Sequence, residues 1–221
     1  MEQRARDLQQ ISFNILVRVG IFSPDEPLEL ERAKIHKHFT DDVLNEAASI
    51  NISQILERQH RKDLSTVPII TIDNAKTQDM DDALSLEIET PENSRSNFTS
   101  KDNKSVSTRI YRLGIHISDV GSLIKPKSLL DIEADYRMAT VYLPEIKIPM
   151  LPCELSDKTA SLSPGQNRSA LSLIVRINEN GEILNWEIFP SVIRTQLALS
   201  YEDADRIITD STHPDHDMLS V

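Results

Sequence analysis

The segment ITIDNAKTQDMDDAL (residues 70–84) places four carboxylates within ten residues, between two apolar segments. They are Asp73, Asp79, Asp81 and Asp82. Carboxylates crowded near a core repel one another, and partial burial makes their charges still more unfavourable. A cation is therefore expected beside them, and ligation by oxygen alone favours Mg²⁺, Mn²⁺ or Ca²⁺ over zinc.

The spacing of these acids also predicts their backbone conformation. In a regular strand Asp79 and Asp81 would share a face while Asp82 points away. All of them can converge only if the DMDD segment leaves strand geometry, so we expect it in a loop or turn at a strand end, where catalytic groups commonly lie. Two alternatives stay open from the residues alone: an acidic loop that is merely solvated, and a structural Ca²⁺ site unrelated to catalysis.

The sequence on both sides of this segment predicts a sheet. Residues 67–73 (VPIITID) are apolar and β-branched, which is typical of a buried strand. Residues 83–89 alternate, with Leu84, Leu86 and Ile88 on one face. Residues 90–108 are almost wholly polar and predict a loop before the next strand, IYRLGIHI. The segments ALSLIVRI and EILNWEIF flank Asn180-Gly181, a strong hairpin signal.

Helical patterns dominate residues 1–65, which we interpret as a helical lead-in region preceding a second region at 66–221. Apolar residues recur at helical spacing from Leu8 to Val19, and Gly20 offers a stop. Thr40 is a candidate cap for a second long helix that reaches Leu56, and Ser128 for a helix that reaches about Met138. The expected fold class is mixed α/β (α+β), with a mixed sheet and helices after the lead-in.

Composition excludes several classes of protein. The 221 residues carry 24 Lys and Arg against 35 Asp and Glu, a net charge of −11, which argues against nucleic-acid binding over the whole surface. None of the five glycines cluster, so a Walker loop or dinucleotide fingerprint is absent. No apolar run approaches the roughly 20 residues that span a bilayer. The single cysteine, Cys153, is more consistent with packing than with catalysis. One cysteine cannot form an internal disulfide, which is compatible with a reducing compartment, and we expect the chain in the cytoplasm, away from membranes.

The acidic segment resembles the signature of the ribonuclease II/ribonuclease R family, the processive 3′→5′ exoribonucleases. That signature is TID, five residues, then DxDDA, and TIDNAKTQDMDDAL (residues 71–84) matches all four acids in identity and spacing. Further similar segments follow in the family's order over roughly residues 60–208. They are LGIHISDV (113–120), YLPEIKIPMLPCELSDKTASLSPGQNR (142–168) and VIRTQLALSYEDAD (192–205).

The resemblance implies an RNB-type catalytic core and a hydrolase acting on ester bonds, an exoribonuclease of the ribonuclease II type. It implies that the four aspartates hold Mg²⁺, or Mn²⁺, and position the scissile phosphate of single-stranded RNA, releasing nucleoside 5′-monophosphates. Tyr142 would pack against the RNA 3′ end and set the length of the final product. The alternative for Tyr142 is a core tyrosine in a strand.

For Asp119 and Arg168 we expect structural roles, a strand-end hydrogen bond and an ion pair. Other RNA-decay factors are expected partners.

The chain also departs from the family pattern. Family members complete the site with an arginine and a glutamate far downstream and carry OB-fold modules that bind RNA, and none of these is visible in the 221 residues. We therefore expect the N-terminal part of the catalytic domain, a fragment whose activity in isolation is open. The alternative is a catalytically incomplete RNA-binding or assembly fragment of the same fold.

Overall fold

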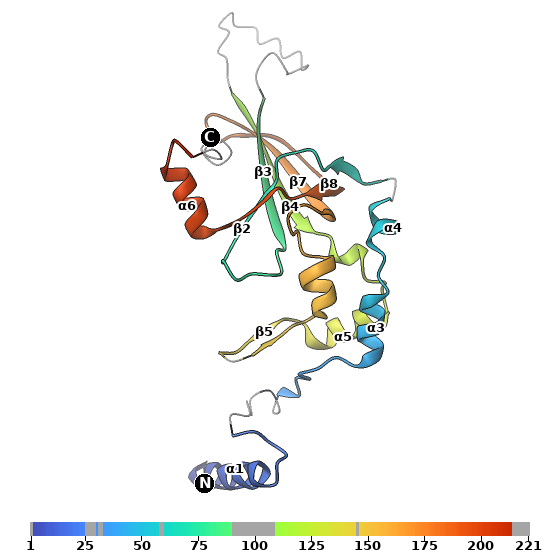
Figure 1. Cartoon of the computed structure of the whole chain (residues 1–221), viewed down its shortest axis with the longest axis vertical. Helices are drawn as coiled ribbons and strands as arrows, with labels where there is room; N and C mark the ends of the chain where they lie inside the picture. Colours follow the sequence, from blue (N-terminus) through green and yellow to red (C-terminus); the bar gives the residue numbers. More distant parts are fainter. Residues whose placement is uncertain are drawn as a thin grey trace, which may run out of the picture. The chain divides into compact units, whose positions relative to one another are not determined.

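The computed structural model (Figure 1) describes residues 2–24, 30, 33–57, 60–89, 109–144 and 146–213, with backbone only for residues 2–7. The chain divides into two compact units, Met1–Phe39 and Thr40–Val221. Among the described helices, none combines the length and the apolar character needed to cross a membrane.

The first unit contains helix α1 (Glu2–Arg18), which the apolar spacing predicts. The chain turns away just beyond the helix at Gly20, whose φ of +75° is a left-handed conformation that glycine adopts without strain. The Ile21 amide donates to the Leu16 carbonyl (2.9 Å), so a carbonyl of the last turn is satisfied as the chain turns away. The rings of Phe13 and Phe22 then lie 6.1 Å apart and fix this turn against the helix.

The second unit begins with two short helices, so the prediction of one long helix from Thr40 to Leu56 is wrong. They are α3 (Asp41–Ala48) and α4 (Ile52–Leu56). Thr40 caps α3 as predicted, but Asn51 Oδ1 accepts from the Ser53 amide (3.1 Å) and starts a new helix. An asparagine side chain that bonds its own backbone favours a cap over a helix interior, which explains the break.

A seven-stranded sheet of order β1-β8-β7-β4-β3-β2-β9 forms the body of this unit (Figure 1). Its strands are β1 (Lys62–Leu64), β2 (Ile70–Asp73), β3 (Asp82–Glu89), β4 (Ile110–Ser118), β7 (Asn167–Asn178), β8 (Ile183–Arg194) and β9 (Leu197–Ser200). The β1/β8 and β2/β9 pairs are parallel and the others antiparallel, so the predicted mixed sheet is confirmed. The β7–β8 hairpin turns at Gly181 (φ +80°), as Asn180-Gly181 predicts.

Shorter elements surround the sheet. Helix α5 (Leu129–Arg137) begins at the predicted Ser128 cap, and α6 (Tyr201–Thr209) follows a capping box of Ser200 and Asp203. The others are the 3₁₀ turn η1 (Val120–Ser122), the hairpin β5 (Val141–Tyr142)–β6 (Lys147–Ile148) and the π-helical turn η2 (Glu154–Thr159). The predicted loop at 90–108 lies outside the described residues.

The two faces of the sheet differ in an unusual way. One face is buried in a core that includes Ala83, Ile174 and Ile193. Leu84, Leu86 and Ile88 share the other face, as predicted, yet that face is solvent-exposed. Its exposed apolar side chains come from four adjacent strands, and they are Leu84, Ile88, Ile117, Leu171, Trp186 and Ile188. Both faces of the sheet therefore carry apolar side chains, whereas the solvated face of an open antiparallel sheet is usually polar.

A ladder of polar side chains crosses the buried face at its centre. His116 Nε2 lies 3.0 Å from Ser85 Oγ, and Nδ1 lies 2.7 Å from Ser172 Oγ, which is 2.6 Å from Ser191 Oγ. These residues come from β3, β4, β7 and β8 in their spatial order, so the ladder links four strands side to side. A side chain at Gly114 would place its Cβ 2.2 Å from Ser85 Oγ, which explains the glycine. Burial, aided by the charge of Arg112, lowers the pKa of His116 to about 4.

This burial predicts an acid-sensitive fold. Between about pH 6.5 and pH 4 the unfolded chain protonates its histidine while folded His116 stays neutral, so stability falls as the pH falls through that window. The loss reaches about 3 kcal/mol at most. Urea unfolding at pH 7 and pH 4.5 should show a smaller difference for His116→Gln than for the wild type, whereas His60→Gln, at an exposed position, should follow the wild type. Parallel profiles for wild type and His116→Gln would contradict this account.

Candidate active site

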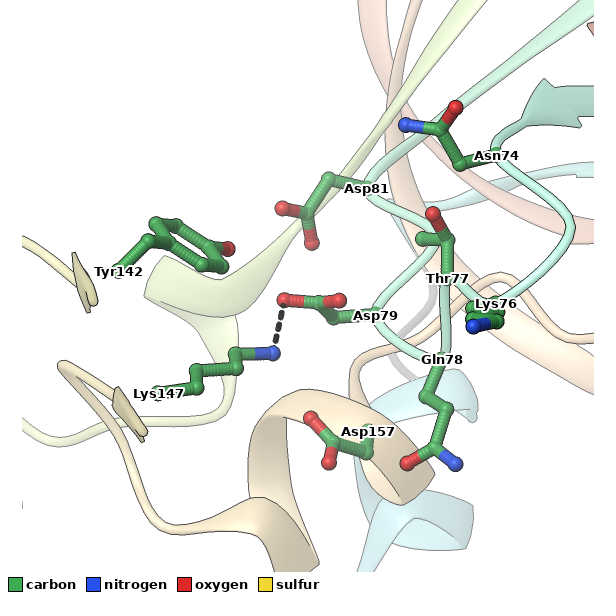
Figure 2. Close-up of a pocket in the computed structure, with 9 residues that line it drawn as sticks. All are labelled: Asn74, Lys76, Thr77, Gln78, Asp79, Asp81, Tyr142, Lys147 and Asp157. Carbon is green, nitrogen blue, oxygen red and sulfur yellow. Dashed lines mark hydrogen bonds and ion pairs between the residues drawn. The ribbon is translucent and has the colours of Figure 1, made fainter. Parts of the chain in front are cut away.

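The acidic segment forms the turn between β2 and β3, as its spacing predicts. Asp73 ends β2, residues 74–81 make the turn, and Asp82 begins β3. Met80 packs against the core, and Thr71 Oγ1 lies 3.5 Å from its sulfur. The neighbours of this inward residue, Asp79 and Asp81, line one pocket, and Figure 2 shows both carboxylates pointing into it.

Backbone hydrogen bonds hold the turn in place. Ser161 Oγ accepts from the Met80 amide (3.2 Å) and donates to the Gln78 carbonyl (2.9 Å). The Leu162 amide donates to the Met80 carbonyl, and the Ser118 amide to the Asp81 carbonyl, both at 2.8 Å. The two aspartates therefore sit on a segment fixed from both sides.

Arg168 and Asp119 support this frame from outside the pocket. Arg168 is buried and donates to the backbone carbonyls of Ser161 (2.8 Å) and Lys158 (2.7 Å). Its role is therefore structural, as expected, but these partners are carbonyl groups and not the expected ion-pair partner. Asp119 makes the expected strand-end hydrogen bond, from its amide to the Ser169 carbonyl (3.0 Å). It also forms an ion pair with Arg61 at 2.6 Å.

The pocket beside the turn is open, with a volume of about 540 Å³. Its lining comes from the acidic turn, the β5–β6 hairpin and η2 (Figure 2): Asn74, Lys76, Thr77, Gln78, Asp79, Asp81, Tyr142, Lys147 and Asp157. Tyr142 is 68% exposed, which excludes the alternative of a core tyrosine. Lys147 Nζ forms an ion pair with Asp79 Oδ2 at 2.8 Å. The sequence patterns gave no signal for Lys147, because its place opposite Tyr142 follows from hairpin register.

The structure does not gather all four aspartates at one point. Asp73 lines a smaller pocket of about 180 Å³ with Ser200 and Asp203, and Asp82 is exposed at the start of β3. Within the described ranges, no three acidic, histidine or cysteine side chains form a group able to hold a metal ion.

The electrostatics of the turn nevertheless favour a cation. Partial burial raises the pKa of Asp81, and the charges of Asp79, Asp82 and Asp73 raise it further. Burial and repulsion from Asp82 and Asp79 likewise raise the pKa of Asp73. Asp73 Oδ2 is also buried without a hydrogen-bond partner in the described part of the chain. These carboxylate oxygens suit a hard divalent ion in donor chemistry, although neighbouring Asp79 is already paired with Lys147.

Comparison with known proteins assigns the chain to a family. Residues 61–219 match the family model described as the RNB domain. The chain belongs to the RNB-domain family. Ribonuclease R of Chlamydia trachomatis is 34% identical over 192 residues, covering 86% of this chain and 25% of that protein. An Arabidopsis thaliana protein named "Inactive exonuclease DIS3L2" is 38% identical over 152 residues, 69% of this chain and 13% of that protein.

Solved structures agree on the RNB fold. RNase R of Mycoplasma genitalium, in complex with ribose-methylated single-stranded RNA, superposes with a TM-score of 0.69 at 23% identity, over 83% of this chain and 26% of that one. The fold class expected from the sequence is thereby confirmed. The chain spans about a quarter of the length of the ribonuclease R relatives that it matches.

Ser161 Oγ bonds both the Met80 amide and the Gln78 carbonyl, and this pair of hydrogen bonds, here called the Ser161 clamp, yields a prediction. Ser161→Ala leaves the Met80 amide and the Gln78 carbonyl without their partner at a site that is fully buried, so we expect a loss of about 2 kcal/mol in unfolding free energy. Hydrogen exchange of the Met80 amide should accelerate at the same time. Ser163→Ala, which removes only a hydroxyl 3.0 Å from Ser161 Oγ, is the matched control and should cost less. Equal losses in the two variants would count against the clamp.

Proposed function

We propose that this chain carries the acidic part of the active site of a 3′→5′ exoribonuclease of the ribonuclease II type, which hydrolyses single-stranded RNA to nucleoside 5′-monophosphates. The observation that carries the proposal is the convergence of Asp79, Asp81 and Tyr142 on one open pocket within an RNB domain. Support comes from relatives named ribonuclease R and from the M. genitalium RNase R structures, solved with single-stranded and with double-stranded RNA.

In this proposal the four aspartates hold Mg²⁺, or Mn²⁺. The donor set and the orphaned oxygen of Asp73 support a divalent ion, and the ligands would come from Asp73, Asp79, Asp81 and Asp82. When bound, such an ion activates water and stabilises charge on the leaving oxygen of a phosphodiester. The chain's own contribution is positional, because Met80 and Ser161 fix the turn that aims Asp79 and Asp81 at the substrate.

Tyr142 supplies a surface for the RNA 3′ end. Its ring is exposed on β5 at the edge of the pocket, and an aromatic face stacks on any base. A stacked terminal nucleotide would hold the scissile phosphate at a fixed distance from the acidic turn. We also propose a cytoplasmic location and contact with other RNA-decay factors, as the family resemblance implies.

A second candidate is an RNA-binding or assembly module without turnover. Two observations favour it: no three ligands gather among the described residues, and one relative is named an inactive exonuclease. The two candidates separate when the chain is incubated with uniformly labelled single-stranded RNA and Mn²⁺. Release of nucleoside 5′-monophosphates from the 3′ end supports the exoribonuclease, whereas RNA binding without any mononucleotide supports the module.

Asp81 is the acid whose replacement we expect to matter most for catalysis. Asp81→Asn keeps the shape but removes a charge from the pocket, so cleavage should fall by at least about 100-fold while RNA affinity is retained. Product formation and fluorescence anisotropy with the same oligonucleotide measure the two effects. Asp135→Asn, on the exposed side of α5, is the control and should cleave normally. Near-normal turnover by Asp81→Asn would refute the assignment.

Tyr142 should determine the size of the smallest product. Tyr142→Ala removes the stacking face, worth about 1–3 kcal/mol per base, so degradation should continue but stop at a longer end product. A product ladder on a denaturing gel reads this directly. Tyr142→Phe keeps the ring and should restore the wild-type ladder, and Tyr201→Ala, at another exposed tyrosine, should not change it. If the ladder of Tyr142→Ala matches that of the wild type, Tyr142 does not hold the RNA end.

A further inference from the structure

Lys147 brings a positive charge into the pocket from the second strand of the β5–β6 hairpin. Its Nζ lies 2.8 Å from Asp79 Oδ2, and Figure 2 shows the side chain reaching toward the acidic turn. Tyr142 stands directly opposite Lys147 in the hairpin register, and its ring centroid is 5.8 Å from the ammonium. One ammonium thus lies between the acidic turn and the proposed base-stacking surface.

This ion pair is more sheltered than a typical surface pair. The side chains of Lys147 and Asp79 are 33% and 23% exposed, so water screens their attraction only in part. A lysine side chain is positively charged at neutral pH, and this ammonium faces the Asp79 carboxylate at 2.8 Å. It does part of what a bound divalent ion would do for this turn.

A divalent ion and the Lys147 ammonium would compete for Asp79. Both seek the same carboxylate, and two positive groups a few ångströms apart repel each other strongly in a partly desolvated site. With Asp79 bound to a metal ion, the ammonium would still belong to the hairpin beside Tyr142 but would lose its nearest anion. In an RNA chain that enters this pocket, the anion available to it is a backbone phosphate.

We infer that Lys147 is a positioning residue that holds Asp79 until the divalent ion arrives and then transfers its ammonium to a phosphate at the RNA 3′ end, beside Tyr142. The inference rests on the proposed function, because it assumes that Asp79 binds the ion and that RNA enters this pocket. It adds a competitor for the metal and a specific contact for the substrate.

Metal binding tests the first half. In Mn²⁺ titrations of the 221-residue chain followed by electron paramagnetic resonance, Lys147→Gln should bind Mn²⁺ about three- to tenfold more tightly than the wild type. Lys147→Arg retains a cation at this position and should stay near the wild type. Lys158→Gln removes the same charge from an exposed pair with Glu154 (2.7 Å) and should leave the affinity unchanged.

RNA binding tests the second half. The probe is a single-stranded RNA whose 3′ linkages are phosphorothioates, which keep their charge and resist hydrolysis. With saturating Mn²⁺, Lys147→Gln should reduce the slope of log K against log salt by about 0.7, as expected for one phosphate contact on a single strand. Without Mn²⁺ the slopes of wild type and Lys147→Gln should agree, because Asp79 then holds the ammonium. Lys158→Gln should match the wild type in both conditions.

The outcomes separate this inference from the function on which it rests. If the wild type binds Mn²⁺ and Lys147→Gln binds it with equal or lower affinity, the inference is wrong and the metal site stands. A slope that changes equally with and without Mn²⁺ overturns the transfer to RNA. If neither chain binds Mn²⁺, the proposed metal site and the inference fail together. Lys147→Met, which keeps the apolar stem, repeats each measurement, and circular dichroism checks that both variants fold.

Discussion

Repulsion among the carboxylates of residues 73–82 is the constraint around which this part of the RNB domain is organised. The chain places four acids in ten residues, and partial burial together with their mutual repulsion raises the pKa of Asp73 and Asp81. Left alone, such a segment would swing outward into water. Two features oppose this movement: Met80 packs into the core between two acids, and Ser161 binds the backbone on both sides of it. Core packing therefore holds the turn in place, although the ion pair of Asp79 with Lys147 relieves only part of the repulsion.

The same constraint explains why residues far apart in sequence meet at this pocket. Lys147 arrives from a two-stranded hairpin and neutralises one charge of the turn, while Arg168 supports Ser161 through its carbonyl. The polar ladder around His116 links β3, the strand that follows the turn, to β4, β7 and β8. The acidic turn, the Ser161 clamp and the β5–β6 hairpin thus act together: the clamp holds the backbone of the turn, and Lys147 of the hairpin neutralises one of its charges.

Much of this fold could be predicted from local patterns. Alternation identified β3, Asn180-Gly181 identified the β7–β8 turn, and Ser128 identified the start of α5, because each depends on neighbours in sequence. The break between α3 and α4 was missed, since one asparagine side chain decides it. The acids could be named from their crowding and spacing, and Tyr142 from the resemblance of its segment to the ribonuclease II/ribonuclease R family, but Lys147 and Ser161 could not be named from either. Their roles depend on contacts between segments about 70 to 80 residues apart, which no periodicity encodes.

The exposed apolar face of the sheet has a consequence for how copies of this chain behave together in solution. An open face bearing Ile117, Trp186 and Ile188 would make molecules adhere wherever they meet. The net charge of −11 opposes such encounters. The range of this electrostatic repulsion shrinks from about 30 Å at 0.01 M ionic strength to about 10 Å at 0.1 M. Colloidal stability should therefore be highest in dilute buffer, and association of the chains should begin at modest ionic strength because the repulsion is then screened.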